Sequence, residues 1–393
     1  MKQLLCSLTL GVMAILLAVP ASAQTFFCAT TGGAGGQSTD DCVNSIQTAV
    51  PFLRIVPDAR SGAMGDVGLA ISPDANSVHF NASKLAFAEE DLGLSATYTP
   101  WLRALGLQDV YLAYLSGYKR ISELETLVFG LRYFSLGNIN FTDNNGMPIG
   151  TGRPNEFEIT FGYARQLTPN FSVAINPKFI YSNLASNQTV NNVEIVPGVA
   201  GAADLSVTYR TQLNATGSPS NLTLAAAITN LGTKISYTRS VNRDFLPANL
   251  GLGAAWELNF DEFNSITFAF DLNKLLVPTP NPDVDWREKS MFSGVISSFG
   301  DAPGGFSEEL RELMYSFGVE YWYDKQFAVR AGYYTEDKTK GNRKFFTVGL
   351  GLKYNIFGLN FSYLVPTTNQ RNPLDNTLRF SLLFDFGAFS EAP

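Results

Sequence analysis

The residue types that perform catalysis are few in this sequence and lie far apart. His79 is the single histidine, so a serine–histidine nucleophilic pair would have to be built on that one residue. It lies in a weakly patterned segment, where a histidine more often makes structural hydrogen bonds. The paired acids Glu89-Glu90 and Glu308-Glu309 are of a common, solvated kind, and the sequence contains no phosphate loop that ends in Gly-Lys-Ser/Thr. We therefore expect no catalytic residue, no cofactor and no enzyme.

The cysteines fit a disulfide better than a metal site. Cys6 lies in an apolar leader, which leaves Cys28 and Cys42 as an even pair. Such a pair in an exported chain is expected to form a disulfide in an oxidising compartment. A metal pair is the alternative, but two sulfurs separated by a glycine-rich stretch with no nearby histidine make a poor site. We predict a possible Cys28–Cys42 disulfide and no metal.

The beginning of the chain has the pattern of a signal peptide over residues 1–23. Lys2 supplies a positive charge, an apolar run extends from Leu4 to Val19, and Pro20-Ala21-Ser22-Ala23 ends in a small-residue cleavage motif. A permanent membrane anchor is the alternative, but the apolar run is short. We expect cleavage after Ala23, followed by a flexible segment over residues 24–50 that contains a glycine-rich tether.

The composition favours a membrane β-barrel over a soluble enzyme. Charged residues make up 16% of the chain and aromatic residues 13%, whereas globular domains contain about 25% charged residues. After the leader there is no apolar run of the ~18 residues that a transmembrane helix needs. The net charge of −7 argues against a nucleic-acid partner, because phosphate binding requires clustered lysine and arginine.

Alternation with period two dominates the remainder of the chain. In residues 346–354 and 378–386, apolar side chains fall on one face and small or polar ones on the other. A soluble sandwich would alternate too, but these runs have the ~9–11 residues that a tilted strand needs to cross a bilayer. Aromatic residues such as Tyr321-Trp322-Tyr323 gather at strand ends, as in interfacial girdles.

We predict an all-β fold, an antiparallel outer-membrane barrel of about 14 strands over residues 92–386, with a tail at residues 387–393. Long outer loops and short inner turns alternate along it, and residues 212–220 form the one lengthy inner turn. The expected strands lie near residues 92–99, 108–118, 121–135, 155–165, 171–183, 202–211, 221–230, 247–258, 264–274, 313–323, 326–334, 344–354, 357–365 and 376–386.

Residues 51–91 lack strong alternation and are predicted to fill the barrel as a hatch. Small residues there would allow close backbone packing in a narrow lumen, and polar side chains would bond to the inner wall. The hatch residues that we single out are Gly62, Gly65, Gly68, Asp74, His79 and Asn81.

The outer loop over residues 275–312 is long enough to carry structure and function of its own. A helix is expected to start near Ser307, which is a plausible N-cap because acids follow it. We favour a partner surface here over a lid that folds into the barrel. Its predicted exposed aromatic residues are Trp286, Phe292, Phe299 and Phe306.

The hatch segment resembles that of FadL-type outer-membrane transporters, whose barrels have fourteen strands. Asn81-Ala82-Ser83 stands where those hatches have Asn-Pro-Ala. At a finer level the chain resembles the PorV family (also called LptO), the FadL-related component of type IX secretion. The stretches that carry this resemblance are residues 52–62 (FLRIVPDARSG), 98–103 (YTPWLR), 131–137 (LRYFSLG), 301–306 (DAPGGF), 341–347 (GNRKFFT) and 376–382 (NTLRFSL).

The resemblance implies a role in protein export at the bacterial outer membrane. A member of this family would dock beside a giant translocon barrel and bind cargo proteins through their C-terminal signal domains. It would then carry the cargo to an attachment complex, where a sortase joins it to lipopolysaccharide. The alternative is a FadL-type channel for hydrophobic small molecules, which requires an apolar lumen and a displaceable hatch.

Overall fold

The computed structural model describes residues 44–102, 106–142, 147–185, 188–190, 193–215, 218–239, 243–281, 284–367 and 377–387. The predicted signal peptide and the pair Cys28 and Cys42 lie outside these residues. Residues 24–43 of the expected flexible segment and residues 388–393 of the expected tail lie outside them too.

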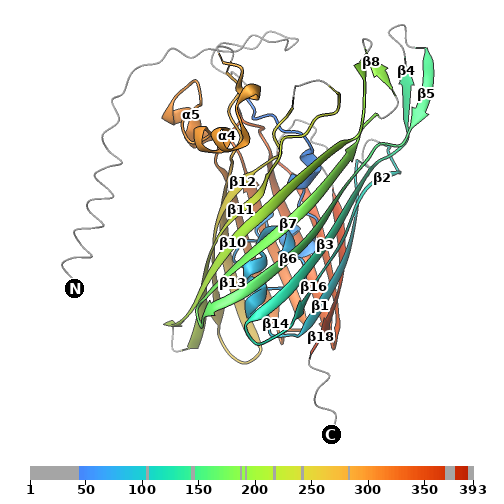
Figure 1. Cartoon of the computed structure of the whole chain (residues 1–393). Coiled ribbons are helices and arrows are strands. Elements are labelled where there is room, and N and C mark those ends of the chain that lie inside the picture. Colours follow the sequence, from blue (N-terminus) through green and yellow to red (C-terminus); the bar gives the residue numbers. More distant parts are fainter. Residues whose placement is uncertain are drawn as a thin grey trace, which may run out of the picture.

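Fourteen antiparallel strands close into a barrel, which confirms the predicted fold class and strand number (Figure 1). Each barrel strand pairs with the barrel strands that precede and follow it in the sequence. The strand β1 (Leu92–Pro100) closes the ring by pairing with β18 (Leu378–Phe386). The strands between them are β2 (Val110–Arg120), β3 (Glu125–Leu136), β6 (Asn155–Thr168), β7 (Phe171–Asn183), β10 (Gly198–Ala215), β11 (Ser218–Gly232), β12 (Asn249–Asn259), β13 (Asn264–Leu275), β14 (Met314–Tyr323), β15 (Phe327–Thr335), β16 (Lys344–Tyr354) and β17 (Phe357–Pro366).

The two ends of the barrel differ, and we name them the loop end and the turn end. The loop end carries the long connections, including the small hairpins β4 (Ile139–Thr142) with β5 (Pro148–Gly152) and β8 (Thr189–Val190) with β9 (Val193–Glu194) (Figure 1). The turn end carries short ones. The predicted lengthy turn at residues 212–220 is wrong, because β10 and β11 stay paired until Ala215 faces Ser218. The turn expected at residues 119–120 also lies later, since β2 continues to Arg120 and β3 begins at Glu125.

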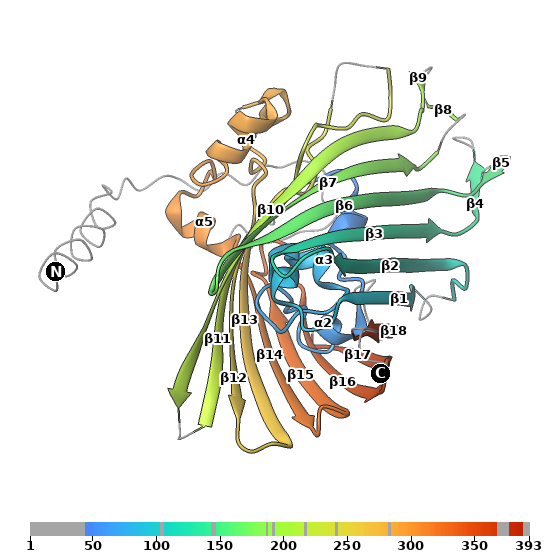
Figure 2. The same ribbon diagram turned by 60° about the horizontal axis from the view of Figure 1, so that its bottom comes forward.

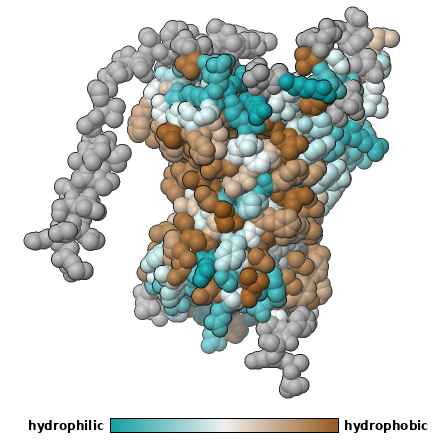
Figure 3. Space-filling view, viewed as in Figure 1, coloured by the Kyte–Doolittle hydropathy of each residue, from teal (hydrophilic) through white to brown (hydrophobic). Residues whose placement is uncertain are grey.

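Alternation along each strand separates an apolar outer face from a polar inner one. On β16 the outward side chains Phe346, Val348 and Leu352 are 53%, 49% and 55% exposed. The same period puts Arg132, Arg330 and Arg379 on the inner wall, where they are fully buried. On the face drawn in Figure 3, apolar residues gather across the middle of the barrel, between more polar ends. A soluble sandwich would bury these side chains, whereas a membrane barrel turns them towards lipid.

The N-terminal segment fills the lumen with short helical turns (Figure 2). These are η1 (Pro51–Arg54), α2 (Ala59–Gly62), α3 (Ser77–Phe80) and η2 (Ala82–Phe87). The chain between α2 and α3 forms no regular element, and the barrel wall supplies acceptors for its backbone N–H groups. Gly68 N and Leu69 N donate to Asp271 Oδ2 at 2.7 and 2.9 Å, and Gly65 N donates to Thr347 Oγ1 at 2.8 Å.

A structured cap lies at the loop end, in the connection between β13 and β14 (Figure 1). It contains η4 (Trp286–Glu288), α4 (Met291–Ser297) and α5 (Phe306–Arg311). Among the residues that the structure describes, no helix is both long and apolar enough to cross a membrane.

Candidate functional site at the loop end and in the lumen

Close backbone packing joins the hatch to the barrel wall. Gly65 has φ +69°, and a Cβ on it would lie 2.6 Å from the backbone nitrogen of Tyr333. A Cβ on Gly62 would lie 2.5 Å from Arg379 Nη1, and one on Gly68 would overlap the ring of Phe80. A side chain at Gly65 would therefore force backbone to move, whereas one at Gly62 or Gly68 would displace the side chain of Arg379 or Phe80, so the hatch is closely packed at these three positions.

Buried charges hold the hatch at the turn end. Arg60, on α2, donates to both oxygens of Glu320 on β14, from Nε at 2.9 Å and from Nη2 at 2.7 Å. Its Nη1 also donates to Asp74 Oδ2 at 2.9 Å, which ties two parts of the hatch together. Arg330 of β15 donates to Glu320 from the opposite side at 2.5 Å. Each charge thus has an opposite partner, which a buried charge requires.

His79 has a structural partner and no catalytic one in its described contacts. Its Nδ1 is within hydrogen-bond distance of Arg132 Nη2, and its ring packs edge-on against Phe80. Arg132 also donates from Nη1 to the carbonyl oxygens of Phe52 and Leu53 at 3.2 and 3.1 Å. The imidazole therefore accepts a hydrogen bond from a fixed guanidinium, which is a packing role.

The side chain of Asn81 holds the turn Asn81-Ala82-Ser83, in which alanine stands at the position of the expected proline. Its Oδ1 accepts hydrogen bonds from Ser83 N at 3.0 Å and from Ser83 Oγ at 2.6 Å. Its Nδ2 donates to the Leu69 carbonyl at 2.9 Å and to Thr208 Oγ1 on the wall at 2.8 Å. Side-chain bonds therefore hold Asn81-Ala82-Ser83 in place, where a proline would have restricted the backbone directly.

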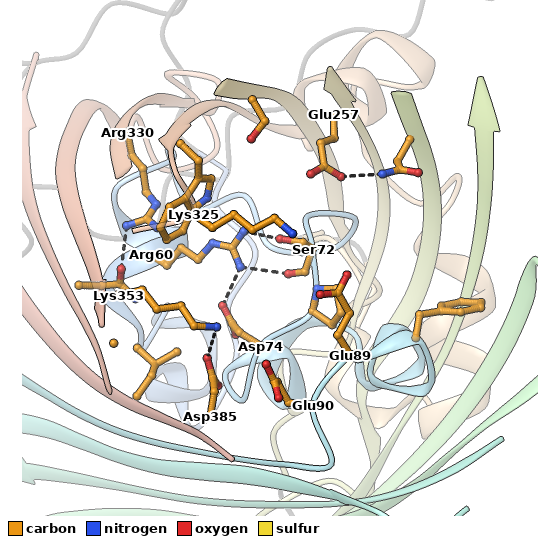
Figure 4. A pocket seen from close by; sticks show the side chains of 18 of the residues that line it. Arg60, Ser72, Asp74, Glu89, Glu90, Glu257, Lys325, Arg330, Lys353 and Asp385 are labelled. Carbon is orange, nitrogen blue, oxygen red and sulfur yellow. Dashed lines mark hydrogen bonds and ion pairs between the residues drawn. The ribbon is translucent and has the colours of Figure 1, made fainter. Parts of the chain in front are cut away.

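A cavity of about 340 Å³ opens between the hatch and the wall at the turn end (Figure 4). It is lined by both signs of charge, and several of these are already paired. Lys353 Nζ lies 2.8 Å from Asp385 Oδ2, and Glu257 accepts from Asn221 Nδ2 at 2.9 Å. In the described part of the chain, no group of three or more histidine, cysteine, aspartate or glutamate side chains is placed to hold a metal ion.

The cap at the loop end turns its charged side towards the barrel. Lys274, next to last in β13, contacts Glu309 at 2.9 Å and Glu312 at 2.5 Å. Lys340, in the connection between β15 and β16, contacts Glu308 at 2.5 Å and Glu312 at 3.0 Å. Burial would raise the pKa of the Glu308 carboxyl, but the hydrogen bond and charge of Lys340 outweigh it and hold that pKa below its ordinary value.

The opposite side of the cap is apolar and exposed. Of the four aromatic residues predicted from the sequence, Phe292, Phe299 and Phe306 are 68%, 54% and 71% exposed. Two further residues belong to this side and were missed: Ile296 and Leu310. Their spacing of four from Phe292 and Phe306 is a helical signal that was available in the sequence.

Two predictions for the cap are wrong. Trp286 is only 7% exposed, because its ring stacks on Phe245 with 6.3 Å between the centroids. Ser307 is not the N-cap, because α5 begins one residue earlier, at Phe306, and Gly305 holds the cap position at φ 67°. The left-handed backbone at Gly305 turns the chain into the helix, and no side chain is used for capping.

The buried charges of the lumen were not predicted from the sequence, namely Arg60, Arg132, Glu320 and Arg330. The signal was a charged side chain in the inward register of a strand, or within the hatch itself. Alternation alone marks such a residue as inward-facing, but it does not say which opposite charge meets it.

The family model described as type IX secretion system protein PorV matches residues 37–282 of the chain. No curated protein matches the sequence. Similar solved structures include the CymD monoaromatic hydrocarbon channel, which is 14% identical with a TM-score of 0.47, the match covering 84% of this chain and 98% of that one. Another is the Ralstonia pickettii toluene transporter TbuX, 12% identical with a TM-score of 0.46, covering 84% and 98%. A Pseudomonas aeruginosa FadL homologue is 11% identical with a TM-score of 0.41, covering 88% and 100%. Because the family model spans more than half of the sequence, the chain belongs to the PorV family of type IX secretion system proteins.

Proposed function

We propose that this protein is a non-enzymatic cargo receptor of type IX secretion in the bacterial outer membrane. It binds the C-terminal signal domain of exported proteins beside the translocon barrel and carries them to the attachment complex that contains the sortase. The family membership supports the secretion role. The closed barrel with its apolar outer band supports the outer-membrane location, with the loop end facing outward and the turn end facing the periplasm.

The observation that carries the cargo-binding part is the exposed apolar face of α4. Phe292 and Ile296 of α4 are 68% and 75% exposed, and Phe299, two residues after the helix, is 54% exposed, while Gly294 on the other side of α4 is buried. Large exposed apolar groups on an ordered element are typical of partner surfaces. Aromatic anchors of this kind suit a β-sandwich domain, which offers apolar side chains and an open strand edge.

The filled lumen supports binding at the loop end over conduction through the barrel. Hatch and wall are joined by buried ion pairs such as Arg60–Glu320 and by backbone bonds to Asp271. A channel for hydrophobic molecules, the alternative, requires this hatch to move and an apolar path to open. The shuttling role needs only an exposed surface and a lipid-facing wall that lets the complex diffuse in the membrane.

A complementation experiment tests the proposal. Cells that lack the gene would receive either the parent or the double variant Phe292→Ser and Phe299→Ser. We expect the variant to reach the outer membrane at the parent level, while cargo proteins are lost from the surface and accumulate in the periplasm. The control is Leu167→Ser at the turn end, because Leu167 is 54% exposed, as Phe299 is.

Two outcomes would count against the proposal. Normal surface display of cargo in cells that lack the gene would remove the secretion role. If those cells instead fail to take up a hydrophobic nutrient, the channel alternative would be supported. Normal display with the double variant alone would move the cargo surface away from α4.

A further inference from the structure

We infer that α5 is an interfacial element whose exposed face lies in the acyl chains of the outer leaflet. This inference does not depend on cargo binding by α4. It would add a membrane-binding surface above the barrel wall itself.

α5 packs against the outside of the barrel wall. On β13, Asp271 faces inward, because its carboxylate accepts the hatch N–H groups of Gly68 and Leu69. Alternation then places Lys274 on the outer face, together with Phe268, which is 46% exposed. Lys274 is nevertheless only 7% exposed, because side chains of α5 and of the residue that follows it cover it.

Ion pairs hold α5 against the wall. Glu309 and Glu312 reach the Lys274 ammonium at 2.9 and 2.5 Å, and Glu308 reaches Lys340 at 2.5 Å. The three carboxylates are 4–6% exposed. The three carboxylates on this side are therefore all paired with lysines of the barrel and its connections.

The opposite side of α5 carries two large exposed apolar side chains beside Ser307. Phe306 and Leu310, four positions apart and so on one helical face, are 71% and 48% exposed. A water-facing helix shows the reverse arrangement, with its apolar side buried and its charges outside. An inverted helix of this kind is stable where its outer side meets hydrocarbon.

The location of α5 identifies the occupant of that face. Lys274 comes directly after the outward residues Phe268, Phe270 and Leu272 in the alternation of β13, so α5 lies just above the lipid-facing band. Figure 3 shows apolar residues on this flank that continue from the band up to the cap. Amphipathic elements with aromatic residues at such a boundary insert into the upper acyl region of the membrane. The exposed face of α5 thus continues an interface that the barrel already makes with lipid.

Tryptophan quenching tests this inference in the full-length protein. Phe306→Trp would be made in a Trp256→Phe background, because Trp256 is 39% exposed on the outer wall and would itself meet lipid. The protein would be reconstituted into phosphatidylcholine vesicles with plain or brominated acyl chains. We expect the added tryptophan to lose most of its emission in brominated lipid. Leu310→Trp should behave alike and serves as a second position if the first variant folds poorly.

The control is Val193→Trp in the same background, because Val193 is 44% exposed in the hairpin β8–β9, away from the band (Figure 1). Its added emission should be equal in both lipids. The inference is overturned if the tryptophans at positions 306 and 310 are as insensitive to bromine as the control. It is also overturned if brominated lipid leaves these tryptophans unchanged while an added secretion partner changes their emission, which would make this face a protein interface.

Discussion

Arg60 and Glu320 form a two-pronged ion pair between the hatch and the barrel wall, 260 positions apart in the sequence. Both nitrogen–oxygen distances, 2.9 and 2.7 Å, fit a charge-assisted bidentate pair. Glu320 is 1% exposed, so its carboxylate depends on these side chains for its partners. The pair therefore links the hatch directly to the barrel wall.

Removing this link should loosen the hatch. With Arg60→Ala, Glu320 still faces Arg330, but a buried pair that loses one partner typically costs about 3–5 kcal/mol. We expect a lower denaturation midpoint and faster proteolysis of the hatch in purified protein. The matched control is Arg165→Ala, whose partner Glu125 lies 3.5 Å away on an exposed surface, where such pairs contribute about 0–1 kcal/mol. Equal effects of the two substitutions would contradict the assignment.

Gly65 should be far less tolerant of substitution than a second glycine of similar backbone conformation. Gly65 and Gly106 have φ +69° and +81°, but a Cβ on Gly65 would clash with Tyr333 whereas one on Gly106 has nothing within 4 Å. An ordinary residue in this conformation costs about 1–2 kcal/mol, which Gly106→Ala should show alone. Gly65→Ala should add the cost of displacing the hatch. The temperature at which heating changes gel migration measures both, and equal shifts would disprove close packing at Gly65.

Acid should release the cap before it unfolds the barrel. The pKa of Glu308 is held below its ordinary value of 4.5, since Lys340 outweighs the effect of burial. A carboxyl with a lowered folded pKa contributes stability above its unfolded pKa, and this contribution is lost as the pH falls through the folded value. Glu312, beside the same lysine, and Asn44, which donates to Glu308 at 3.0 Å, face this group as well.

Protease cleavage within the cap, followed against pH, measures this release. We expect cleavage to increase below about pH 4.5, the ordinary value for a glutamate. Glu308→Gln should raise cleavage at neutral pH and flatten the profile. If the cap of the parent protein resists cleavage down to the pH of global unfolding, then these contacts do not hold the cap in place.

His79 should matter for stability and not for secretion. It accepts from Arg132, which is fully buried, so His79→Ala leaves a guanidinium nitrogen without this partner. Such a loss costs about 1–3 kcal/mol. We expect a lower melting temperature and unchanged cargo display once protein levels are matched. Lost display at parent stability would instead indicate a chemical role for the imidazole.

Most of the barrel could be predicted from the sequence, because the signals that define it are local. Period-two alternation marked each strand, and the even strand number followed from the alternation of long and short connections. Errors occurred at strand ends: β3 begins at Glu125, and β10 and β11 extend into the supposed turn up to Ala215 and Ser218. Between β10 and β11 the polar residues that usually mark a turn continue the ladder, since pairing with the neighbouring strand outweighs their weak local preference.

The candidate site was less predictable, because exposure depends on what the rest of the chain covers. Trp286 and Phe292 are both aromatic and lie six positions apart in one loop, yet one stacks on Phe245 and the other is 68% exposed. Nothing in their immediate neighbours distinguishes them. The resemblance to the PorV family could be recognised from short stretches of residues, and the match over residues 37–282 confirms it.

The sequence by itself determined the barrel, its strand number and its family, because these depend on repeated local patterns. Only the tertiary structure decided which charges meet and which apolar groups stay outside. Arg60 finds Glu320 because closure of fourteen strands brings β14 to the hatch. Glu309 and Glu312 find Lys274 because the connection after β13 folds back on the outer wall. Those ion pairs hold the charged side of the cap against the barrel, and its apolar side is therefore left exposed.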